Sequence, residues 1–380
     1  MTTTTDEPTF VGNKLRLARN FNDLTQVDLA QRASVTHSTI HHLEAEIRQP
    51  SKELVAALSH ILGFAPSFFF KPVKEEFRED ECQFRGKGMS ATLKTRVLAY
   101  GTLFGMFVRF ADRWARLPRI YLPDMADKPQ QGREGIERAA EDLRRSRGLG
   151  LDRPITSMCR VLENMGAVVT RFAASTESSS AMTVDAFSRV GSRPVVVLNT
   201  DKDSTSRTRW DMAHELGHLL LHRGLRPDNP TLEEEADFFA SSLLLPRVGF
   251  LREFPQQARL SWDTVFAMKR RWKASAASIV RRAFELGRID AAEYRRAWKH
   301  YSYRGWRLGE PDEPADEPPE IVPLALDVIE QSTGATPLDV ARALGWSAET
   351  FERVLGVSPK PLSPQPEQEA KVIPLLRQTA

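Results

Sequence analysis

Residues 210–222, WDMAHELGHLLLH, place three histidines and a glutamate within nine positions of a chain that holds only eight histidines. His214 and His218 are four residues apart, so on a helix they lie one turn apart on the same face. Glu215 directly follows the first of them. This is the HExxH pattern, in which two imidazoles bind zinc and the glutamate takes a proton from the attacking water.

A catalytic zinc needs a third protein ligand. The segment TLEEEADFFASSLLLP (231–246) offers Glu233, Glu234 and Glu235, whose side chains point in three directions on a helix. Asp237 lies one turn after Glu233, on the same side. We therefore expect Glu233 to be the third ligand and Asp237 to hold the free N–H of a histidine. Glu235 is the alternative ligand.

The same residues would also suit a surface helix with solvated histidines. Leu216, Leu219, Leu220 and Leu221 argue against this interpretation, because they make the helix strongly apolar and favour its burial. Buried histidines beside a buried glutamate need partners. We therefore expect one Zn²⁺ per chain, with Mn²⁺ and Fe²⁺ as alternatives for a His/His/Glu set. His222 either faces the site and steadies the tetrahedral intermediate, or caps the end of the helix.

The sequence HELGHLLLH, followed at short spacing by EEEADFFASSLLLP, closely resembles the ImmA/IrrE family of metallopeptidases. The resemblance covers residues 151–307 and implies a zincin-like domain with a small antiparallel sheet and C-terminal helices. It also implies that His214, His218 and Glu233 are the zinc ligands and that Glu215 is the general base. Members of the family are thought to cleave or inactivate helix-turn-helix repressors, which switches on stress, phage or mobile-element genes.

Residues 10–72 resemble a phage-repressor-type (XRE) helix-turn-helix domain, on the evidence of LTQVDLAQRASVTHSTIHHLEAEIRQPS (24–51). The turn carries Ser34 where glycine is usual. The second helix of such a domain enters the major groove with its N-terminal residues. The expected base contacts come from His37, Ser38 and His42. The expected phosphate contacts come from Gln26, Thr36 and Thr39, with Arg48 as a further candidate. A helical bundle that binds only protein is the alternative, since Asn, Gln and Arg are commoner base readers than His.

The composition limits the surfaces, the cysteine chemistry and the cell compartment that we expect for this chain. A net charge of +3 confines any basic surface to a local patch. The two cysteines, Cys82 and Cys159, have no CxxC spacing, which excludes a disulfide framework and fits a reducing compartment. The N-terminus MTTTTDEPTF lacks the features of a signal peptide, and the most apolar run, 97–110, is too short to span a bilayer. We expect a cytoplasmic protein with no membrane partner.

We expect a mostly helical α+β protein. Its predicted parts are the helix-turn-helix domain (10–72), a helical connector (77–150), the peptidase domain (151–307), a Pro- and acid-rich linker (308–322), a small helical segment (323–358) and a disordered tail (359–380). Within the peptidase domain, β-rich runs at 167–173, 181–188 and 193–200 supply the sheet.

Together these features predict a DNA-binding transcription regulator that carries a zinc-dependent endopeptidase domain of narrow, regulated specificity. Its substrate would be a helix-turn-helix repressor, or the chain itself at the exposed segments 77–90 or 309–322. Its partners would be double-stranded DNA, the repressor-type protein and a second copy of the chain on a palindromic site. The alternative is a transcription factor whose peptidase-like domain senses a ligand or partner without hydrolysis.

Overall fold

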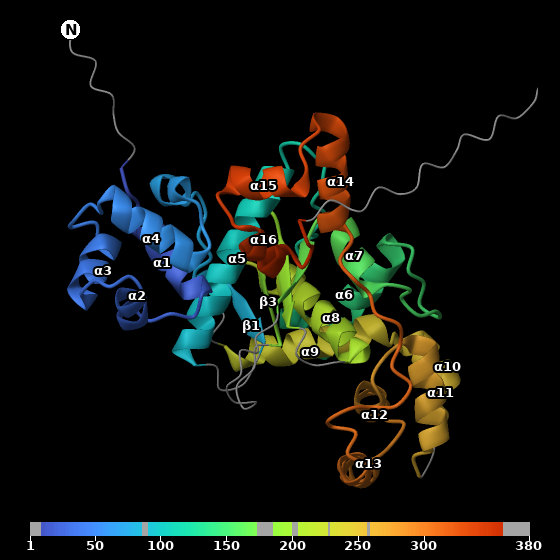
Figure 1. Ribbon diagram of the computed structural model, residues 1–380. Coiled ribbons are helices and arrows are strands. Elements are labelled where there is room, and N and C mark those ends of the chain that lie inside the picture. Colours follow the sequence, from blue (N-terminus) through green and yellow to red (C-terminus); the bar gives the residue numbers. More distant parts are fainter. Residues whose placement is uncertain are drawn as a thin grey trace, which may run out of the picture.

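The computed structural model describes residues 9–85, 90–172, 185–199, 204–226, 229–256 and 259–359. The tail that we expect to be disordered lies outside the described residues beyond position 359. The chain forms a mostly helical α+β fold with a small sheet at its centre (Figure 1). The N-terminal helices lie to one side of this sheet, and residues 262–303 lie to the other side.

The N-terminal domain is all helical. It consists of α1 (Gly12–Phe21), α2 (Gln26–Arg32), α3 (His37–Glu44), α4 (Lys52–Leu62) and the 3-10 helix η1 (Pro66–Phe70). Ala30, Ile40 and Leu43 are buried between α2 and α3, and Val35 packs against them. This is the predicted helix-turn-helix arrangement.

Side-chain caps fix where its helices begin. The Thr25 hydroxyl accepts a hydrogen bond from Asp28 N, and the Asp28 carboxylate accepts one from Thr25 N in return. Thr36 caps α3 by accepting from Thr39 N. Between the two helices the chain passes through Ser34 at φ 54°, a left-handed conformation that glycine adopts with less strain. The helix-turn-helix geometry is therefore kept although the usual glycine is absent.

Four strands form one mixed sheet. They are β1 (Gln83–Arg85), β2 (Val168–Phe172), β3 (Ala186–Arg189) and β4 (Val195–Asn199), in the order β1-β3-β4-β2. β4 pairs antiparallel with β3 but parallel with β2. Our expectation of an antiparallel sheet is therefore wrong for the pair β2 and β4. The short turn after β3 forces the antiparallel pairing with β4, whereas β2 joins the other edge of β4 and is free to run parallel. β4 is buried along its whole length, as is typical of parallel strands covered on both faces.

The sheet separates two hydrophobic cores. Val195 and Val197 of β4 belong to the core shared with α5 (Ala91–Ala111) and the N-terminal domain. Val196 and Leu198, which point the other way, belong to the core built around α8 (Thr205–Leu221). The helix that carries HELGH therefore lies against one face of the sheet.

Most of the rest of this second core is helical. Its helices are α6 (Gly132–Ser146), α7 (Met158–Asn164), α9 (Pro230–Leu244), α10 (Arg247–Glu253), α11 (Trp262–Trp272), α12 (Ala276–Glu285) and α13 (Ala291–Tyr303). Two short 3-10 helices, η2 (Glu79–Glu81) and η3 (Pro129–Gln131), contribute no buried residue. The closest helix pairs are α8 with α9 and α6 with α9. None of the helices in the described ranges combines the length and the apolar character that a bilayer crossing requires.

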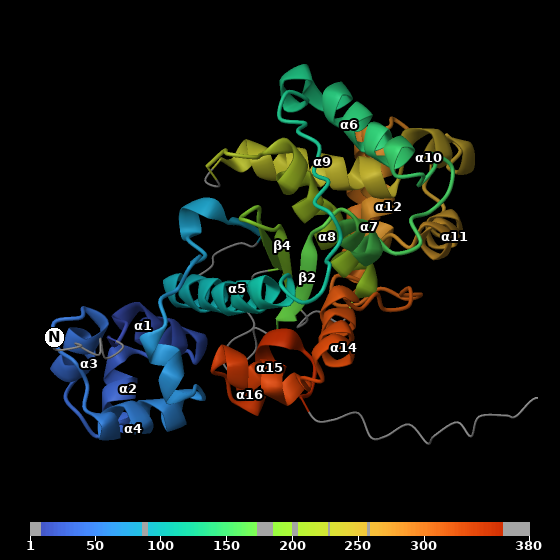
Figure 2. The same cartoon turned by 90° about the horizontal axis from the view of Figure 1, so that it is seen from above.

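The expected connector, 77–150, is not a separate layer. Its first strand, β1, extends the sheet, and α5 covers the sheet face opposite α8 (Figure 2). The Tyr100 hydroxyl of α5 lies 2.7 Å from the carbonyl oxygens of both Arg171 and Val354. The apolar run at 97–110 is therefore a core helix, and α5 joins the sheet to the C-terminal helices.

The expected linker, 308–322, is docked through several of its carboxylates, although many of its residues remain exposed. We call residues 309–320 the acidic strap, because several of its carboxylates bind residues of neighbouring helices. Glu313 accepts hydrogen bonds from Ser206 N at 2.8 Å and from Lys269 Nζ at 2.6 Å. Glu317 forms a buried ion pair with Arg209 and accepts from Met158 N at 2.7 Å. The composition of the segment suggested a solvated linker. Instead, its carboxylates accept hydrogen bonds from backbone N–H groups at helix N-termini and form ion pairs with buried cations.

The last three helices join the N-terminal domain to the sheet. They are α14 (Ile321–Thr333), α15 (Pro337–Leu344) and α16 (Ala348–Leu355). α14 and α16 contact both α5 and β2 (Figure 2). On the other side, Thr350 Oγ1 donates to Gly63 O at 2.8 Å and Arg353 Nη1 donates to Asn22 Oδ1 at 2.9 Å. This segment is therefore packed between the two main parts of the chain.

Candidate metal centre

The helix α8 is buried along most of its length. Ser204 caps it by accepting from Arg207 N. His214, Glu215 and His218 are at most 2% exposed. Gly217 allows α9 to approach closely, because a Cβ atom there would lie only 3.2 Å from Ala236 Cα. The close packing of the two helices is what brings a side chain of α9 to the histidines of α8.

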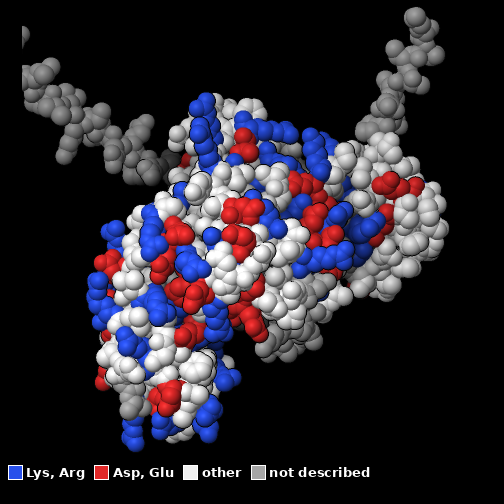
Figure 3. Space-filling model, turned by 180° about the vertical axis from the view of Figure 1, so that it is seen from behind, with Lys and Arg blue, Asp and Glu red and all other residues white. Residues whose placement is uncertain are grey.

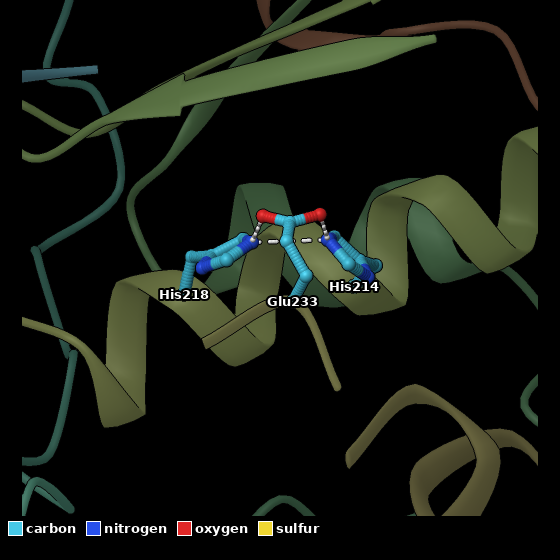
Figure 4. A group of neighbouring side chains, drawn as sticks. All are labelled: His214, His218 and Glu233. Atoms are coloured by element: carbon cyan, nitrogen blue, oxygen red, sulfur yellow. Dashed lines mark hydrogen bonds and ion pairs between the residues drawn. The ribbon is translucent and has the colours of Figure 1, made fainter. Parts of the chain in front are cut away.

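Glu233 of α9 reaches between the two histidines (Figure 4). Its Oε2 lies 3.4 Å from His214 Nε2, and its Oε1 lies 3.1 Å from His218 Nε2. The two Nε2 atoms are 2.9 Å apart. These three side chains can offer one ligand atom each, all within 4.8 Å of one another. Two imidazole nitrogens and one carboxylate oxygen are donors that fit a divalent transition metal.

The free nitrogen of each histidine has a partner of its own. Asp237 Oδ1 lies 2.9 Å from His214 Nδ1. On the other side, His222 Nδ1 lies 2.9 Å from His218 Nδ1, and His222 Nε2 lies 2.9 Å from Glu235 Oε2. His222 is also the C-cap residue of α8, which is one of the two expectations for it. That it steadies the tetrahedral intermediate stays a prediction. Glu235, the alternative third ligand, is engaged with His222 instead.

The charges in this group favour metal binding. Burial acts to raise the pKa of Glu233, but hydrogen bonds with His214 and His218 outweigh it and hold this pKa well below its usual range. Burial, together with the neighbouring His218 and His214, lowers the pKa of His222 to about 3. Glu233 is therefore a carboxylate and His222 a neutral imidazole at neutral pH.

Two further residues support Asp237, and the sequence did not lead us to them. Trp210 Nε1 donates to Asp237 Oδ1 at 3.3 Å, and Arg281 Nη1 donates to Asp237 Oδ2 at 3.0 Å. Trp210 lies four residues before His214, so the spacing of the helix contained a signal for it. Arg281 comes from α12, far along the chain, and nothing in the sequence pointed to it.

Two cavities of about 350 Å³ each lie near the site. One is lined by His218 and His222 together with Arg189 of β3. The other is lined by Trp210, Arg281 and Asp185, which directly precedes β3. β3 therefore runs from one cavity to the other past the histidines, which is the course that an extended polypeptide would need.

The candidate DNA-binding residues lie on or next to α3, except Gln26, which begins α2. His37 and Ser38 are exposed, whereas Thr39 and His42 are half-buried. His41, which the sequence analysis did not single out, is also exposed and stacks on His37 with ring centroids 6.5 Å apart.

The two candidate phosphate contacts at helix starts already have partners within the domain. Gln26 Nε2 donates to Glu44 Oε2 at 2.8 Å, and Thr36 Oγ1 caps α3. Basic and acidic side chains are interspersed over the face seen in Figure 3, in keeping with the net charge of +3. Any basic surface that contacts DNA must therefore be a small patch.

Fold and site together define a helix-turn-helix protein that also carries a metallopeptidase-like domain. Comparison with family models agrees with this: residues 163–284 match the IrrE N-terminal-like domain of the peptidase M78 family, and residues 11–67 match a helix-turn-helix domain. The predicted combination of these two domains in one chain is confirmed. A comparison with curated proteins finds no match.

Proposed function

We propose that the chain is a DNA-binding transcription regulator whose peptidase domain hydrolyses a peptide bond with the help of zinc. The observation that carries the proposal is the position of the Glu233 carboxylate between His214 Nε2 and His218 Nε2, with Glu215 buried on the same helix. His214, His218 and Glu233 would hold the zinc. Bound there, zinc would act as a Lewis acid that polarises the peptide carbonyl and makes water more acidic.

The chain's own residues would perform the proton transfers. Glu215 would accept a proton from the attacking water on its carboxylate and deliver it to the leaving amine. Asp237 and His222 would orient the two imidazoles by hydrogen-bonding their Nδ1 atoms, which lie 2.9 Å from these partners. The substrate would lie extended between the two cavities, with its side chains in them.

Replacing Asp237 by asparagine should weaken metal binding by about 10–100-fold, because the amide is a poorer acceptor for the His214 N–H. It also removes the charge that pairs with Arg281. Competition with a zinc chelator of known affinity measures the change. Glu234→Gln, which alters an exposed residue of the same helix, is the matched control and should bind metal as tightly as the wild type. Equal affinities for the Asp237→Asn variant and the wild type would contradict the proposed role.

A separate repressor protein is the favoured substrate. Of the two candidate self-cleavage segments, 309–322 is held by the ion pairs of the acidic strap. In segment 77–90, Phe77 and Cys82 are buried. Proteases cut exposed, unstructured chain most readily. Cleavage of the chain by itself within 309–322, or next to Phe77 or Cys82, would first require that stretch to be released.

The experiment that tests this proposal compares new protein N-termini in a cell extract. The extract is incubated with the zinc-loaded wild type, or with the wild type stripped of metal. We expect a new N-terminus within one helix-turn-helix protein, or within the chain itself, only in the zinc-loaded sample. If no new N-terminus forms while the zinc stays bound, hydrolysis is refuted and the non-hydrolytic sensor remains.

The helix-turn-helix domain would bind double-stranded DNA through α3, with a second copy of the chain on a palindromic site. We expect His37→Ala to weaken binding to a duplex selected from a random pool by about 5–150-fold, the effect of losing one base contact of 1–3 kcal/mol. Binding to an unrelated duplex should change little. His60→Ala, an exposed histidine on α4, serves as the control. Fluorescence anisotropy at constant salt concentration measures both affinities. Equal losses on the two duplexes would contradict base reading by His37.

A further inference from the structure

A cavity of about 220 Å³ lies where the N-terminal domain meets α5 and α15. Its lining comes from α1, from the segment after η1, from α5 and from the end of α15, which Figures 1 and 2 place around one junction. Five of the lining residues are cationic: Lys14, Lys71, Lys74, Arg109 and Arg113. No acidic side chain is among the described residues that line it. The cavity shares no residue with the three candidate metal ligands.

Lys14 differs from the other four cations, because its side chain is buried with no anionic partner among the described residues. The residue is 1% exposed. Its Nζ lies 3.5 Å from the sulfur of Met106 and 3.9 Å from the centre of the Phe68 ring. Among the described residues, no carboxylate pairs with it. A thioether and an aromatic ring replace only a small part of the hydration that a buried ammonium group loses.

The neighbouring positive charges make the buried, charged form of Lys14 still less favourable. Burial, together with the nearby Arg109 and Lys71, lowers the pKa of Lys14 to about 7. Among the described residues, Arg109 has one ion pair, to Glu75 Oε2 at 3.1 Å. Glu75 also accepts from the Ser192 hydroxyl and pairs with Arg189, which has a second partner in Glu81. The charge of Glu75 is therefore divided between Arg109 and groups outside the cavity.

The outer cations are exposed. Lys71, Lys74 and Arg113 form no ion pair with any described residue. They surround the opening of a cavity whose inner end is Lys14. Such an arrangement attracts a multiply charged anion from solution and then desolvates part of it against Lys14.

We propose that this cavity binds a small phosphate-bearing anion, either inorganic phosphate or a phosphomonoester. The ligand would contact Lys14 of the N-terminal domain and Arg109 of α5 at once. It would thereby stabilise the docking of the DNA-binding domain on the rest of the chain. A phosphate of the DNA backbone is the less favoured source, because no residue of α2 or α3 lines the cavity.

The test uses the full-length protein and isothermal titration calorimetry at fixed ionic strength, with inorganic phosphate and glycerol 3-phosphate as probes. We expect the wild type to bind one anion per chain, and Lys14→Met to bind it at least about 10-fold more weakly, a loss of about 1.4 kcal/mol. Lys52→Met, an exposed lysine on α4, should bind as the wild type does. Arg113→Ala, at the opening, should show an intermediate loss without any change to the buried interior.

Thermal unfolding separates this role from a purely structural one. We expect phosphate to raise the Tm of the wild type more than chloride of equal ionic strength does, and to have no such effect on Lys14→Met. The proposal is overturned if neither probe binds the wild type. It is equally overturned if Lys14→Met binds both probes with unchanged affinity, or if the substitution weakens only the binding of duplex DNA.

Discussion

Glu215→Gln should lower the kcat of peptide hydrolysis by about 10²–10⁴-fold, because a carboxamide cannot accept the proton of the attacking water. Glutamine has nearly the same shape as glutamate, so the fully buried position should tolerate it. Glu215 is not among the three residues whose ligand atoms converge, and the metal content should therefore stay unchanged. The assay uses a peptide that spans the scissile bond found in the extract experiment, with metal content measured on the same sample.

The control separates loss of a proton acceptor from loss of the site. Glu234→Gln makes the same chemical change on the exposed side of α9 and should retain the wild-type kcat. If Glu215→Gln keeps full activity while its zinc is bound, another group takes the proton and the proposed role of Glu215 is wrong. If Glu215→Gln loses its zinc, the residue supports the metal site and the kinetic comparison must be made at saturating zinc.

Glu317→Ala should lower the free energy of unfolding of the peptidase domain by about 3–5 kcal/mol. The reason is that Arg209, which is fully buried, would lose its anionic partner and keep only the carbonyl oxygens of Lys273 and Ile155. The variant would also lose the bond from Met158 N. Denaturant unfolding followed by tryptophan fluorescence measures the change.

A double variant and a surface variant show whether the buried charge is the cause. Arg209→Met combined with Glu317→Met removes both charges and should recover much of the loss, because a hydrophobic pair can replace a buried ion pair at little cost. Glu320→Ala breaks the exposed pair with Arg160, where both side chains are over a third exposed. It should cost at most about 1 kcal/mol. Equal losses for Glu317→Ala and Glu320→Ala would refute the assignment of the strap as a docked element.

Local signals in the sequence account for the parts that were predicted. The spacing of His214 and His218 gives their common helical face, and Thr25 and Thr36 mark the starts of α2 and α3. Glu233 and Asp237 could be linked to the histidines because they too are one helical turn apart. These relations depend on a few neighbouring residues and on fixed helix geometry.

Contacts between distant segments account for the parts that were missed. β1 pairs with β3 across roughly a hundred residues, and its three residues carry no pattern that distinguishes an edge strand. The acidic strap has the composition of a solvated linker, yet Lys269 and Arg209 turn it into a docked segment. Arg281 reaches Asp237 only because α12 packs beside α9, which no periodicity reveals.

The metal content of the purified protein shows whether His214, His218 and Glu233 form a zinc site. Mass spectrometry would be applied to the wild type, His218→Ala and Glu233→Ala, all purified without added metal. We expect about one zinc ion per wild-type chain and a loss of zinc in both variants, while Glu235→Gln keeps it. A wild type that contains no metal and takes up none from micromolar zinc would refute the zinc site and, with it, zinc-dependent hydrolysis.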